Sequence, residues 1–417
     1  MSNFWKKHKK KILLFLAVVG PGLITAVADN DAGGVATYTV AAAAFGMASQ
    51  FFVIPTTILL GVTQSIGAKI SLVTGQGLGE LIRKKFGVRV SVVLFFFYLI
   101  VNEGVVLQNV SGLKASLQVF NAPWQAGLIL TCLVLSAAVI FLNYRKLQKV
   151  FLVMILFYVA YIISGVLAHP DWGDALRESL VFPRHVNILD VNYWFSLIAV
   201  LGTTVTAWGQ FFISSFIVDK GLTIDNLSDE NTEIYAGAFI TNFFSWMIAL
   251  SVTYTLFIHK IIVNDGYSAA LAIKPLAGGF ATTLFAGGLF GASLLGLTIV
   301  PLATSYVFTE LFGYERTLNA NFKAGRTFYI FFILQLLFGL TAALFPQINL
   351  FKLTLYADYL NGAMLPVIFF FLIKFSEDEE VMGKHKSGKW AGIFIRVAAG
   401  VITLAVVATF VGKIFLK

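Results

Sequence analysis

The chain has 417 residues, of which 58% are hydrophobic and 12% charged, and its mean hydropathy is +0.84. This composition excludes an ordinary soluble domain and indicates a helical membrane protein that crosses the bilayer many times. The formal net charge of +9 does not indicate nucleic-acid binding, because the Lys and Arg of membrane proteins collect in loops. The single cysteine, Cys132, excludes an intrachain disulfide and a cysteine-based metal cluster.

The amino terminus places five lysines within residues 6–11, directly before a long apolar run. This pattern resembles a signal peptide. The run, however, is long, carries acids, and lacks a convincing small-residue cleavage site. We therefore expect it to be retained as a first span at about 12–45.

Two carboxylates, Asp29 and Asp31, lie near the predicted middle of this first span. A charge inside the bilayer costs several kcal/mol, so an acid there marks a functional site. Gly33 and Gly34 follow and are poor helix formers, so we expect the helix to break beside the acids. Carboxylates and freed backbone carbonyls would make an all-oxygen site, which suits a hard cation. The alternative is a kinked helix whose acids face a water-filled vestibule.

Ten further spans follow in the hydropathy pattern. We place them at about 49–74, 90–115, 124–142, 150–168, 192–218, 235–263, 281–312, 327–345, 349–374 and 390–413, with a short interfacial segment at 264–278. Basic clusters occur at 83–89, 145–149, 315–326 and 384–389. These positions predict a cytoplasmic amino terminus and an outside carboxy terminus in a multi-pass cell-membrane protein.

A second interruption lies five spans after the first. The stretch 201–210 holds two Gly, three Thr and one Gln inside a span. Paired interrupted helices indicate an inverted-repeat transporter with its site at the midplane. We therefore predict one domain, 1–417, with repeats at about 12–168 and 192–374 and an extra helix at about 390–413. The alternative for each of Thr203, Thr204 and Thr206 is a hydrogen bond to its own helix.

Both interrupted stretches resemble the NRAMP family of divalent-metal transporters, which have the LeuT-type fold. The family's first-helix motif, Gly-Pro-Gly and then Asp-Pro-Gly-Asn, matches 20–22 and then Asp31-Ala32-Gly33-Gly34. Its sixth-helix motif, Gly-Ala-Thr-Val-Met-Pro-His-Asn, matches 202–209 in a degenerate form. The resemblance implies an all-α polytopic protein whose first and sixth helices are broken at mid-membrane. The candidate metal-site residues are Asp31, Ala28, Gly34, Thr203, Thr206, Asp29 and Gln210.

The departures from the family motifs bear on the substrate. The family's Asn ligand is replaced by Gly34, its Met by Thr206, and its His, which is tied to proton movement, by Trp208. Loss of the thioether removes a ligand that favours transition metals. Gly34 and Thr206 are expected to enlarge the site for a partly hydrated ion. These changes resemble the NRAMP-related magnesium transporters and predict transport of Mg²⁺, and also Mn²⁺, without proton coupling.

Other polar residues in the spans form a second tier. Glu103, Asp358 and Trp208 are candidates to support the site. Gln64 is expected to bond between helices. Glu310 is expected to be solvated near the end of a span.

Three other functions compete with magnesium transport. One is a proton-coupled Mn²⁺/Fe²⁺ importer of ordinary NRAMP type. Another is an amino-acid symporter on the same fold, although Asp29 and Asp31 would repel its substrate's carboxylate. The last is an intramembrane aspartyl protease using Asp31 and Asp358, whose expected Gly-x-Gly-Asp context is missing. We expect no enzymatic activity and no cofactor. The expected partners are divalent ions and the lipid bilayer, and a monomer is plausible.

Overall fold

The structure is a computed structural model that describes residues 20–182, 186–187, 189–261, 263, 266–315, 318, 322–345 and 350–415. Within these ranges the regular structure is entirely helical. Ten segments of this described part are long and apolar enough to cross a membrane. With the interrupted pair at the start of the chain they account for the eleven predicted spans.

The first five spans are α2 (Pro21–Ala28) with α3 (Ala32–Phe45), α4 (Val53–Thr74), α5 (Leu78–Val119), α6 (Trp124–Phe141), and α7 (Tyr144–Ile155) with α8 (Val159–Leu167). The next five are α10 (Val191–Thr204) with α11 (Ala207–Lys220), α12 (Leu227–Val252), α13 (Gly266–Phe312), α14 (Arg326–Leu344) and α15 (Leu350–Glu377). α17 (Lys389–Phe415) follows, and the short α9 (Trp172–Leu180) and α16 (Glu379–Met382) lie in connections. Residues 266–278, predicted as a short interfacial segment, belong to the same helix as the following span, and the candidate membrane span on α13 begins at Thr282.

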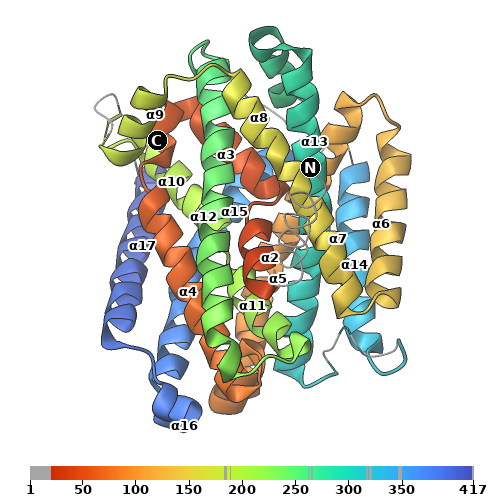
Figure 1. Ribbon diagram of the computed structural model, residues 1–417, viewed down its shortest axis with the longest axis vertical. Helices are drawn as coiled ribbons and strands as arrows, with labels where there is room; N and C mark the ends of the chain where they lie inside the picture. Colours follow the sequence, from red (N-terminus) through yellow and green to blue (C-terminus); the bar gives the residue numbers. More distant parts are fainter. Residues whose placement is uncertain are drawn as a thin grey trace, which may run out of the picture.

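Both interrupted helices lie in the middle of the bundle. α2 and α11 occupy the lower half of Figure 1, and α3 and α10 lie in the upper half, so the two pairs cross the bundle in opposite directions. α2 packs against α11 and α12, and α3 packs against α5, α10 and α12. Protein therefore surrounds both breaks, which is the condition for tolerating irregular backbone at membrane depth.

The outer surface and the centre of the bundle differ in burial. α17 is the least buried of the candidate spans, and the segment formed by α10 and α11 is the most buried. Large apolar side chains such as Leu404 and Phe410 are exposed on α17. They suit hydrocarbon rather than water, whereas the interrupted helices meet other helices on all sides.

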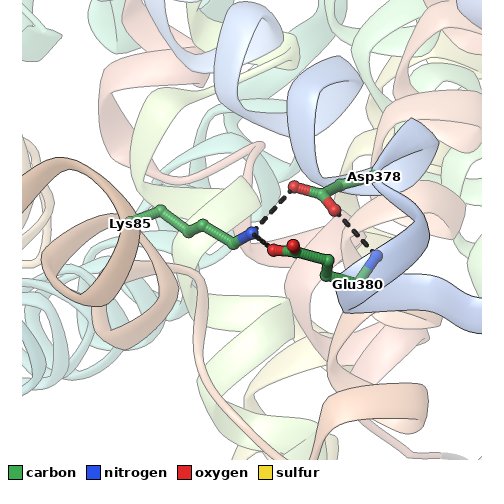
Figure 2. Close-up of polar contacts among 3 residues, drawn as sticks. All are labelled: Lys85, Asp378 and Glu380. Carbon is green, nitrogen blue, oxygen red and sulfur yellow. Dashed lines mark hydrogen bonds and ion pairs between the residues drawn. The ribbon is translucent and has the colours of Figure 1, made fainter.

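The end of α15 is joined to α5 by charged side chains, as Figure 2 shows. Lys85 Nζ lies 3.0 Å from Asp378 Oδ2 and 2.6 Å from Glu380 Oε2. Asp378 also accepts the Glu380 N–H at 2.9 Å, which caps α16. The Lys85 ammonium holds the pKa of Asp378 below its ordinary value. Exposed ion pairs contribute little stability, so this cluster serves mainly to place α16 beside the first turns of α5.

Candidate functional site

The first break is the tripeptide Asp29-Asn30-Asp31, between α2 and α3. Asp31 caps α3, because its Oδ1 accepts the Gly34 N–H at 3.1 Å. A carboxylate at this position satisfies a backbone donor that a helix start leaves free. The prediction of a break beside the acids is confirmed. Its stated cause is wrong, because Gly33 and Gly34 lie inside the first turn of α3.

The two glycines allow neighbouring side chains to come close. A Cβ at Gly33 would lie 2.1 Å from Gln108 Oε1, and one at Gly34 would lie 2.8 Å from Asn30 Oδ1. Such separations are far below van der Waals contact. Gly34 therefore does not enlarge a cavity in this structure, contrary to the prediction, because Asn30 takes up the space.

Asn109 of α5 holds the second oxygen of Asp31. Its Nδ2 donates to Asp31 Oδ2 at 2.6 Å, and its Oδ1 accepts the Ala32 N–H at 3.1 Å. That N–H is the ordinary helical partner of the Ala28 carbonyl, so this carbonyl loses that bond at the end of α2. Sequence reasoning did not single out Asn109. The sequence feature that could have identified it is a side-chain amide within an apolar span, six residues after Glu103.

Asp29 joins the two breaks. It accepts a hydrogen bond from Thr206 Oγ1 at 2.5 Å and another from Gln64 Nε2 at 3.0 Å. Gln64 was expected to bond between helices in general, and its partner proves to be this carboxylate. Thr206 also caps α11, because its Oγ1 accepts the Gly209 N–H at 2.9 Å. A bond to its own helix therefore does not explain Thr206, whereas it does occur at Thr204, which donates to Val200 O at 2.7 Å.

A third carboxylate, Asp358, reaches the same region from α15. It accepts a hydrogen bond from Thr37 Oγ1 at 2.5 Å, and the Thr203 hydroxyl and the Gln108 side chain also face it. Asp31 interacts electrostatically with both Asp29 and Asp358. The three carboxylates are only 1–2% exposed, and within the described ranges none forms an ion pair with Lys, Arg or His. Buried carboxylates without a cationic partner require a proton or a metal ion.

Several polar atoms around the breaks are buried without a hydrogen-bond partner in the described part of the chain. They belong to the side-chain amides of Asn30 and Gln210 and to the indole N–H of Trp208. Such atoms are uncommon in folded proteins. The amide oxygens of Asn30 and Gln210 are therefore available as further neutral ligands, while Trp208 can only donate.

The predicted site residues do not all meet. Glu103 is on α5 and has no contact with the three carboxylates among the described contacts. It lies six residues from Asn109, or about 9 Å along the helix axis. Glu310 was expected to be solvated, but it is buried. It accepts hydrogen bonds from Ser215 Oγ at 2.6 Å and from the Gly79 N–H at 3.1 Å, which ties the start of α5 to α11 and α13.

The site is closed in this conformation. A cavity of about 10 Å³ lies beside Ala32, Gln108 and Thr354, which is about the space that one water needs. In the described part of the chain no three His, Cys, Asp or Glu are grouped to hold a metal ion. Each oxygen of Asp29 and Asp31 already accepts a hydrogen bond. A cation would therefore have to share these oxygens with hydroxyl, amide and backbone N–H donors, or displace the donors.

Long apolar helices around two mid-bundle breaks, with acids buried at one of them, define a multi-span membrane protein with the LeuT-type fold. Residues 22–412 match the model of the natural resistance-associated macrophage protein-like family, and the chain belongs to this family. The predictions of an all-α fold of this type and of the NRAMP family are confirmed.

Individual relatives cover nearly the whole chain. A Listeria welshimeri protein named divalent metal cation transporter MntH is 22% identical over 405 residues, which are 93% of this chain and 88% of that protein. The structure resembles that of a mutant of the Eremococcus coleocola manganese transporter with a TM-score of 0.74 and 16% identity, covering 96% of this chain and 88% of that one. It also resembles MhsT in complex with L-phenylalanine, with a TM-score of 0.61 and 15% identity, covering 95% and 98%. At these identities the solved structures show the fold alone.

Proposed function

We propose that the protein transports divalent metal cations across the membrane by alternating access, with Mn²⁺ as a substrate. The observation that carries this proposal is that Asp29, Asp31 and Asp358 are all buried around the first helix break, where Asp31 interacts electrostatically with the other two, and that none has a cationic partner in the described part of the chain. A divalent ion would neutralise this charge. The names of the relatives support the same class of substrate.

The ligand atoms available at the breaks are all oxygens. Carboxylates come from the three acids, a hydroxyl from Thr206, and amide oxygens from Asn30 and Gln210. Oxygen ligands suit Mn²⁺ and Mg²⁺ alike. The relatives' names favour Mn²⁺. Mg²⁺ remains a second candidate, because Thr206 stands where the ordinary family motif has Met, and membership of the magnesium-transporting branch is part of that second proposal.

Proton coupling separates the two proposals further. Trp208 replaces the family's titratable His, and its buried indole cannot carry a proton through a transport cycle. This replacement supports transport without stoichiometric protons. The alternative is proton-coupled import of Mn²⁺, as in the ordinary NRAMP type. It would have to use the buried acids to carry the protons.

Uptake into proteoliposomes tests the proposal. Purified protein is reconstituted, Mn²⁺ is added outside with and without excess Mg²⁺, and a metal dye and a pH dye are read inside. We expect Mn²⁺ entry above that of protein-free liposomes, competition by Mg²⁺, and no metal-dependent acidification. Entry no faster than in protein-free liposomes would overturn the proposal. Failure of Mg²⁺ to compete would remove the magnesium candidate, and acidification that follows metal entry would establish proton coupling.

A further inference from the structure

An apolar groove of about 640 Å³ lies between α5 and α15, away from the helix breaks. Its walls include Val93, Phe97 and Val101 of α5 and Leu360, Val367 and Phe371 of α15. Every lining side chain is apolar except Arg89. The volume falls in the range of about 300–1,000 Å³ that is typical of small-molecule sites.

The groove opens toward the lipid. Val93 is 59% exposed and Phe97 is 58% exposed, and both belong to a candidate membrane span. Val101 lies twelve residues after Arg89, which corresponds to about 18 Å of helix. One leaflet of hydrocarbon is about 15 Å deep. The groove therefore has the length of an acyl chain's path from the membrane surface to the midplane.

A positive charge stands at one end of the groove. α5 is interrupted at Gly87, where φ is 79° and ψ is 177°, and Arg89 lies two residues after this interruption. No hydrogen bond or ion pair of Arg89 occurs within the described ranges. Lys85, four residues earlier, is instead engaged by Asp378 and Glu380 (Figure 2).

A second cation flanks the same end. Lys374 lies seven residues after Val367 on α15, so the two share a helix face. Its side chain is exposed, and it too has no partner in the part of the chain that the structure describes. Phe86 packs edge-on against Phe371 with ring centroids 5.2 Å apart, which brings the two helices together at this level.

We propose that this groove binds an anionic phospholipid. One acyl chain lies between α5 and α15, and the phosphate accepts hydrogen bonds from the Arg89 guanidinium and the Lys374 ammonium. Apolar walls with cations at the surface end match such a molecule, because anionic headgroups attract basic side chains at the membrane surface. A zwitterionic lipid with the same chains fills the groove equally well but gains less from the cations.

The lipid would affect the same helices that reach the breaks. Gln108 of α5 donates to Thr354 O of α15 at 2.8 Å, and Asp358 lies two residues before Leu360. A lipid that holds α5 against α15 therefore supports the packing that places Asp358 beside the first break. We expect it to raise the melting temperature of the closed protein.

Native mass spectrometry of delipidated protein tests the site. Palmitoyl-oleoyl phosphatidylglycerol and the phosphatidylcholine with the same chains are titrated separately, and binding is compared with and without excess inorganic phosphate. We expect one phosphatidylglycerol to bind at least about tenfold more tightly than phosphatidylcholine. Arg89→Gln leaves only Lys374 and should lower this preference, and Ala363→Phe, which fills the groove, should weaken the binding of both lipids. Lys149→Gln changes an exposed lysine outside the groove and should leave binding unchanged.

Several outcomes would overturn the proposal. One is an Arg89→Gln protein that elutes as a folded species and keeps the full preference. Another is phosphatidylglycerol binding that inorganic phosphate abolishes, which would indicate an anion site without lipid specificity. Dimers that persist after lipid removal, and that Ala363→Phe dissociates, would assign the groove to a second copy of the chain. None of these readouts depends on metal transport.

Discussion

The two helix breaks share their capping and differ in charge. Asp31 caps α3 through the N–H of Gly34, and Thr206 caps α11 through the N–H of Gly209, in both cases three residues onward. The first break adds a second acid, Asp29, whereas the second break has no ionisable side chain. The same kind of cap thus begins α3 with a carboxylate and α11 with a neutral hydroxyl. The difference places the attraction for a cation at the first break and leaves the second to supply neutral oxygens.

The largest effect is expected at the first break. Asp31→Ala removes the carboxylate that caps α3 and interacts electrostatically with the other two acids, so we expect metal transport to be abolished. Flux into proteoliposomes measures the effect, and elution as a folded species shows that the protein is intact. Asp174→Ala on the exposed α9 is the control and should transport normally. Near-normal flux in folded Asp31→Ala would show that the charge at this break is not needed.

Glycine substitutions compare the packing at the two breaks. A Cβ at Gly209 would lie 2.6 Å from Asp29 Oδ1, and one at Gly33 would lie 2.1 Å from Gln108 Oε1. Gly33→Ala and Gly209→Ala should each lower the free energy of unfolding by about 1–3 kcal/mol through overpacking. Gly400→Ala on α17, where a Cβ meets nothing within 4 Å, should be neutral or slightly stabilising. Thermal melts measure all three, and equal stability would contradict the close packing.

Thr206→Met tests what the second break, which has no ionisable side chain, contributes to the choice between metal ions. Thr206→Met replaces a hard oxygen by a soft sulfur, which Mg²⁺ binds poorly. We expect the ratio of Mn²⁺ to Mg²⁺ uptake to rise by up to tenfold, which is about 1.4 kcal/mol, and cadmium to bind more tightly. Gly34→Asn, the companion change that restores the family motif, would collide with Asn30 in this conformation. An unchanged ratio in Thr206→Met would show that residue 206 does not contact the ion.

The smallest effect is expected from the cap itself. Thr206→Ala removes the bond to Gly209 N–H and leaves Asp29 Oδ1 without its donor, and caps are worth about 1 kcal/mol. Thr206→Ser keeps the hydroxyl and should retain most of the stability. If Ser destabilises as much as Ala, the methyl group rather than the hydrogen bonds explains the position. Denaturant unfolding of the three proteins decides between these possibilities.

Sequence reasoning located both breaks because acids, glycines and threonines within apolar spans are local signals. It could not find Asn109 or Thr37, nor the partner of Gln64, because each of these side chains meets its carboxylate from another helix. These contacts depend on how helices rotate and pack, which hydropathy does not encode. The same limit explains the wrong prediction for Glu310. Its position near the end of a span suggested that it is solvated, but α5 and α11 cover it.

The most direct test of the account is the position of Mn²⁺ in crystals of the protein soaked with that ion. Anomalous scattering locates the metal without assumptions about transport. The account predicts a peak between the carboxylates of Asp29 and Asp31, with the hydroxyl of Thr206 on its other side. A peak elsewhere, such as beside Glu310, with none at the first break in crystals that bind Mn²⁺ would contradict it.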